Sequence, residues 1–159
     1  MDENFQTDVE GIFAAGNVLH VHDLVDFVSM EAEALADSAA RYIKEGPLAP
    51  CPIRIHTDKN LGHTIPQKVS GARNFNLSMR VTHPMGNCRI AVSQGDREIA
   101  AKEMKKAIPA EMIQMEIPCE KLEADKPLEI TCESRMPDKG PERSREKPVW
   151  DKNLEVHKQ

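Results

Sequence analysis

The sequence predicts an α+β protein in which a short strand and a long helix precede a small antiparallel β-sandwich. Apolar residues recur at helical spacing over 24–45, alternate with polar residues in four later segments, and almost disappear after residue 134. We therefore expect a strand-loop-helix unit over residues 1–46, a linker and β-domain over 47–134, and a disordered charged tail over 135–159.

Charge is distributed unevenly along the chain. Residues 1–46 hold 10 acidic and 2 basic side chains, and the whole chain of 159 residues has a net charge of -5. Nucleic acids and anionic membrane surfaces both attract clustered Lys and Arg. We expect neither as a partner, and no apolar run approaches the roughly 20 residues of a membrane span. A cytoplasmic location fits these features best.

The first unit contains a candidate ligand site. Residues 12–15 are apolar and uncharged, which is typical of a short strand buried on both faces. The segment ends at Gly16 and Asn17. Glycine lets the backbone approach a bound group, asparagine offers an amide, and a following helix points its free N–H groups at the same place. The pattern predicts a site for a polar ligand.

The long helix should run from about Leu24 to Glu45. Asp23 is a good N-cap residue, Asp26 lies in the first turn, and Gly46 followed by proline is a strong stop. The N-terminus of such a helix carries roughly half a positive charge, which suits an anionic group. The periodicity alone is equally consistent with a helix that only packs against the rest of the protein and binds no ligand.

Histidines cluster at one place, His20 and His22. A His-x-His pair could bind a metal, but the spacing identifies no third or fourth ligand. We therefore favour a loop with one histidine packed and one exposed to solvent. The carboxylates of Glu31 and Glu33 lie two residues apart on the helix, so we assign them to a solvated face.

The segment Thr7–Asn17, with its Gly-Ile-Phe-Ala-Ala-Gly core, resembles the second FAD motif of the pyridine nucleotide-disulfide oxidoreductases. The continuation through residues 18–29 is similar to one branch of them, FAD-dependent oxidoreductases that end in a small β-domain. The resemblance implies that Asn17, where the family usually has Asp, holds a ribityl hydroxyl of FAD. It also implies that the helix start at Val25 and Asp26 lies near the flavin pyrimidine ring.

Other hallmarks of these enzymes are missing from the sequence. It contains no Gly-x-Gly-x-x-Gly for the FAD pyrophosphate, no second fingerprint for NAD(P)H and no Cys-x-x-Cys pair. The resemblance therefore implies a C-terminal fragment or subunit of an NAD(P)H-linked flavoenzyme, inactive by itself and completed by a chain that carries the pyrophosphate and NAD(P) sites. The alternative is a non-catalytic β-sandwich interaction module that retains a vestigial flavin-site helix.

The second unit begins after a proline-rich linker at residues 47–52. Strict alternation predicts four strands, and we assign the ambiguous segment Arg97–Ile108 to a fifth strand, although its residues prefer helix. The four clear strands lie at residues 75–81, 88–92, 113–117 and 128–132. Strands at this spacing favour an antiparallel sandwich of immunoglobulin-like architecture. The four cysteines are scattered, so we expect buried free thiols: Cys51, Cys88, Cys119 and Cys132.

Overall fold

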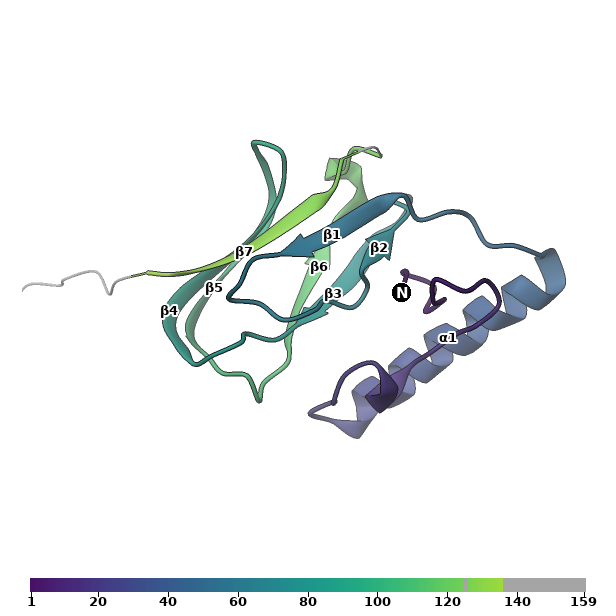
Figure 1. The fold of residues 1–159 in the computed structure, drawn as a ribbon, viewed down its shortest axis with the longest axis horizontal. Helices are drawn as coiled ribbons and strands as arrows, with labels where there is room; N and C mark the ends of the chain where they lie inside the picture. The colour runs from purple at the N-terminus through teal and green to yellow at the C-terminus, as the bar shows by residue number, and fades with distance from the viewer. Residues whose placement is uncertain (125, 136–159) are drawn as a thin grey trace, which may run out of the picture.

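The computed structural model describes residues 1–124 and 126–135 and shows an α+β fold, in which one long helix lies beside a two-sheet β-domain (Figure 1). The general class predicted from the sequence is confirmed. The helix is α1 (Val25–Glu45), and two 3-10 turns are η1 (Gly16–Val18) and η2 (Cys119–Lys121). The strands are β1 (Ile53–Thr57), β2 (Lys68–Val69), β3 (Phe75–Met79), β4 (Met85–Gln94), β5 (Arg97–Ala107), β6 (Ile113–Ile117) and β7 (Leu128–Ser134).

The strands form a five-stranded sheet in the order β2-β1-β7-β4-β5 and a two-stranded sheet of β3 and β6. The pair β1 and β7 is parallel, which corrects our expectation of a purely antiparallel domain. These are the first and last strands of the β-domain. Parallel neighbours require a long crossover connection, and the rest of the domain supplies it here.

Every strand expected from alternation is present, and the segment from Arg97 is confirmed as a strand. β5 pairs with β4 along its whole length through a hairpin at Gly95, where φ is +57°. Cross-strand pairing thus overrides the helix preference of its residues. The strands β1 and β2 were not predicted, although Ile53 and Ile55 alternate with exposed neighbours.

The main hydrophobic core cluster lies within the β-domain, and Met1 is the one buried apolar residue among residues 1–46. Its buried side chains come from both sheets and extend along the chain from Ile53 to Cys132. In contrast, Ser38 is the one buried residue of α1. The β-domain therefore has a core that needs no side chain from residues 1–46.

We expect residues 52–134, expressed alone, to fold cooperatively. The measurement is a far-ultraviolet spectrum dominated by β-structure, with a single unfolding transition in urea. A helical spectrum or a transition without cooperativity would contradict the separation of the two units.

Helix α1 ends as the sequence predicts and begins differently. Gly46 is the C-cap, with φ +86° and its N–H donating to the carbonyl of Tyr42 at 3.0 Å. The N-cap residue, however, is Leu24, which provides no side-chain hydrogen bond. Asp23 is not the cap, because its carboxylate binds the β-domain instead: the two oxygens lie 2.6 Å from Arg80 Nη2 and 2.6 Å from the backbone nitrogen of Met112.

Residues 12–15 do not form the doubly buried strand that we expected. Phe13 makes one isolated antiparallel bridge with Gln6, and the side chain of Ile12 is 54% exposed. A strand buried on both faces needs neighbouring strands, and in the described part of the chain these are found only from β1 onward.

The N-terminal residues run between α1 and the β-domain and join them by polar contacts (Figure 1). Asn4 is buried, and its Oδ1 accepts from Arg41 of the helix at 3.0 Å and from Arg73 of the β-domain at 2.9 Å. Glu3 accepts from the hydroxyl of Ser70 at 2.7 Å. The two units are therefore attached through hydrogen bonds rather than through a shared apolar core.

Two further expectations concern the ends of the structure and its thiols. The tail that we expected to be disordered lies outside the described residues from residue 136 onward.

In the described part of the chain no helix has the length and hydrophobicity to cross a bilayer. All four cysteines are free, but only Cys88 and Cys132 are buried, whereas Cys51 and Cys119 are partly exposed.

Candidate functional site

The loop at Gly16 and Asn17 brings the predicted ligand-site residues to one end of α1. Gly16 is buried with φ +73°, a conformation that favours glycine, and its N–H donates to Glu31 Oε2 at 3.0 Å. Asn17 is exposed, and its Oδ1 accepts from the backbone N–H of His22 at 3.3 Å. The amide of Asn17 is thus oriented by the loop and remains open to a ligand.

The start of α1 is also open. Val25 is 75% exposed, Asp26 is exposed, and Leu24 offers no side-chain acceptor to the first N–H groups. Uncapped N–H groups at a helix N-terminus can bind a negatively charged or carbonyl oxygen. All four predicted cofactor-binding residues therefore lie in one loop and the helix turn that follows it.

Apolar side chains surround this helix start and are not covered. All eight large apolar side chains that are exposed in the described part of the chain fall within the first 46 residues. Five of them belong to the loop and the first turns of the helix: Val18, Val21, Leu24, Val25 and Met30. Exposed apolar residues gathered in this way mark a surface for a ligand or a partner.

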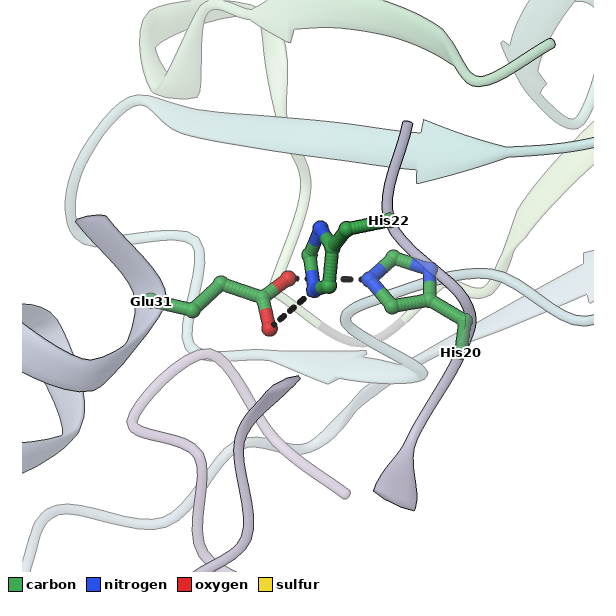
Figure 2. A group of neighbouring side chains, drawn as sticks. All are labelled: His20, His22 and Glu31. Carbon is green, nitrogen blue, oxygen red and sulfur yellow. Dashed lines mark hydrogen bonds and ion pairs between the residues drawn. The ribbon is translucent and has the colours of Figure 1, made fainter. Parts of the chain in front are cut away.

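Both histidines of the loop are packed, which corrects our expectation that one would be solvated. The side chains of His20 and His22 are 6% and 3% exposed, and Glu31 of α1 contacts both (Figure 2). The distances are 2.9 Å from His20 Nε2 to Oε1 and 3.0 Å from His22 Nε2 to Oε2. His22 Nδ1 is buried with no hydrogen-bond partner in the described residues.

Glu31 does not belong to a solvated face. Its side chain is 13% exposed and accepts hydrogen bonds at both oxygens. Burial by itself raises the pKa of this carboxyl group, but the hydrogen bonds from His20 and Gly16, with the charges of the two imidazoles, outweigh burial and lower it. Glu31 is therefore an ionised group enclosed by the loop that precedes its own helix.

Glu31 is the functional candidate that the sequence reasoning missed. It follows Phe27 by four residues and precedes Leu35 by four, and both of these are partly buried on the inner face of α1. The i, i+4 spacing therefore indicated an inward position. The two-residue separation from Glu33 does not by itself reveal this position.

A cavity of about 320 Å³ lies between α1 and the β-domain. Phe27, Met30 and Glu31 line it from the helix, and Phe75 and Ser78 line it from β3. The carboxylate that binds the two histidines therefore also borders a space large enough for several water molecules.

Neither of two cysteine thiols is activated. Burial, together with the carboxylates of Asp2 and Glu3, raises the pKa of the Cys51 thiol to about 12. Burial and the neighbouring Cys88 raise the pKa of Cys132 to about 12. A nucleophilic cysteine needs a lowered pKa, so neither Cys51 nor Cys132 offers thiolate chemistry at neutral pH.

We expect the Asp23 contact to stabilise the fold in a pH-dependent way. The hydrogen bond from the N–H of Met112 lowers the pKa of Asp23. Burial acts in the opposite direction, and the guanidinium of Arg80 lowers the pKa further. A lowered pKa gives stability that is complete above about 3.9, the unfolded value, and is lost as the pH falls through the folded value. Asp23→Asn should cost up to about 1 kcal/mol at pH 7, because the pair is partly exposed.

The measurement is the urea midpoint of the wild type and of Asp23→Asn at pH 7 and pH 3. The difference between the two urea midpoints should be smaller at pH 3 than at pH 7. Asp37→Asn is the matched control, since Asp37 is an exposed carboxylate on α1, and it should leave the midpoint unchanged. An equal difference at both pH values would show that the carboxylate charge contributes nothing.

Comparison with known proteins identifies no relative: no family model, curated protein or solved structure matches this chain.

Proposed function

We propose that this chain supplies the flavin-facing wall of an NAD(P)H-linked, FAD-dependent oxidoreductase, either as its C-terminal part or as a subunit. The observation that carries the proposal is the open start of α1 beside Gly16 and Asn17. The sequence motif that resembles the second FAD motif ends at this point, and the apolar residues around it are uncovered.

The residues present suit the ribityl and flavin-ring end of FAD. Asn17 offers an exposed amide, and the helix start offers N–H groups that no side chain caps. The sequence has no glycine-rich phosphate loop, so the pyrophosphate must be held by another polypeptide segment. That segment would also carry the NAD(P) site and cover the exposed apolar side chains.

FAD, when bound, supplies the electron transfer, and the protein supplies binding and electrostatics. Asn17 would accept a hydrogen bond from a ribityl hydroxyl. The N-terminal end of α1, with its partial positive charge, would stabilise negative charge on the flavin near Val25 and Asp26. The surrounding apolar side chains exclude water once a partner covers them. The buried, unpaired thiols Cys88 and Cys132 agree with a reducing, cytoplasmic setting.

The test compares the chain alone with the chain co-expressed with a candidate partner polypeptide that carries a Gly-x-Gly-x-x-Gly motif. Alone, the chain should be colourless and should not oxidise NAD(P)H, because it lacks the phosphate cradle. The co-purified pair should contain FAD, seen as flavin absorbance in the visible. Stoichiometric FAD on the chain alone, or a pair that forms without flavin, would overturn the proposal.

A further inference from the structure

We propose that His20, His22 and Glu31 form a binding site for a divalent transition-metal ion, with zinc as the preferred ion. This site lies in the same loop as the proposed flavin wall but stands on a different observation, the convergence of two imidazoles on one carboxylate. The bound ion would join the loop before α1 to the second turn of the helix.

The three donor groups already point at one another (Figure 2). The two Nε2 atoms lie 2.9 and 3.0 Å from different oxygens of Glu31, and the three ligand atoms lie within 4.8 Å of one another. Ligands placed tetrahedrally around zinc at about 2.0–2.2 Å are roughly 3.4 Å apart. Small side-chain rotations therefore suffice to admit the ion.

The loop and helix hold the donors in place. The N–H of Gly16 fixes one oxygen of Glu31 at 3.0 Å, and the two imidazole rings pack edge-to-face with centroids 4.5 Å apart. His22 Nδ1 has no partner in the described residues, so Nε2 is the ring nitrogen of His22 that makes a hydrogen bond.

Ligand type and burial select the class of metal. Imidazole nitrogens favour zinc and its neighbours over magnesium and calcium, which prefer oxygen ligands. The side chains are 6%, 3% and 13% exposed, so the charge of the ion would be felt strongly and competing water largely excluded. Two histidines and one glutamate make up the protein ligands of zinc sites that keep a fourth position for water.

The pocket between α1 and the β-domain reaches one of the three ligands. Glu31 lines this space of about 320 Å³, whereas neither histidine is among its lining residues. The alternative is that His20, His22 and Glu31 only form hydrogen bonds with one another and bind no ion. A direct zinc titration distinguishes this alternative from the metal site.

The experiment uses the purified full-length chain without an affinity tag, titrated with zinc against a chromophoric chelator. We expect one zinc per chain for the wild type. His22→Ala and Glu31→Gln should each weaken binding at least about 100-fold, since losing even the hydrogen-bond partner of a ligand costs 10- to 100-fold. The matched control is His56→Ala, an exposed histidine of β1, which should bind zinc like the wild type.

A second measurement does not depend on the variants folding. X-ray absorption of the zinc-loaded wild type should show two imidazole ligands, oxygen ligands and no sulfur. No stoichiometric binding by the wild type, equal affinity in the His22 and Glu31 variants, or thiolate ligands would each overturn the proposal. Because the chain is tested without FAD, failure here leaves the flavin proposal standing, and the reverse also holds.

Discussion

Ile90→Ala should lower the free energy of unfolding by about 2–5 kcal/mol, the range for removing buried branched side chains from a core. Ile90 is fully buried on β4, where it lies opposite Cys132 of β7 and Lys102 of β5. The variant leaves a cavity between the two sheets, and the strands on both sides are too firmly paired to close it. Urea unfolding followed by circular dichroism measures the loss.

Ile43→Ala is the matched control for this prediction. It makes the same chemical change on α1 at a side chain that is 82% exposed. The cost there should stay within about 0.5 kcal/mol, because exposed positions contribute little to stability. Equal midpoints for the two variants would mean that the core does not lie where the structure places it.

Asn17→Leu should weaken FAD binding by the reconstituted pair about 5- to 150-fold. The change removes an acceptor and leaves a ribityl hydroxyl unpaired in a buried site, at a cost of about 1–3 kcal/mol. Gly16→Val should cost more. Gly16 has φ +73°, which a β-branched residue adopts only with strain.

Equilibrium titration of FAD, followed by flavin fluorescence, measures both affinities. His56→Ala is a control for general damage, since His56 is exposed on β1, outside the loop and α1. FAD binding that survives the changes at both Asn17 and Gly16 would show that the loop and α1 are only scaffolding.

The elements that depend on local pattern could be predicted from the sequence. Helix α1 was expected from Leu24 and begins at Val25, and Gly46 ends it as predicted. Alternation located strands β3, β4, β6 and β7, and the Gly95 hairpin favoured strand for β5. These features are decided by side-chain periodicity and turn chemistry within a few residues.

Features that depend on distant contacts could not be predicted. The parallel pairing of β1 with β7 joins Ile55 to Leu128, and nothing near either residue in the sequence specifies it. Asp23 is a good cap by type, yet Arg80 and the N–H of Met112 compete for its carboxylate. The burial of both loop histidines likewise follows from the position of Glu31 on the helix.

The resemblance drew attention to Gly16, Asn17 and the helix start, and their role in binding stays a prediction. In the structure Gly16 is buried, whereas Asn17, Val25 and Asp26 are exposed. The structure also places the carboxylate of Glu31 against this loop, whereas from the sequence we assigned Glu31 to a solvated face. The two proposed ligands, a flavin and a metal ion, would thus be bound by residues of one loop and of α1.

The most direct measurement of the flavin proposal is the FAD affinity of the Gly-x-Gly-x-x-Gly polypeptide with and without this chain. If the chain supplies the ribityl and ring contacts, adding it should tighten FAD binding at least tenfold, and the Asn17→Leu chain should recover only part of that gain. An FAD affinity that is the same with and without this chain would contradict the proposal.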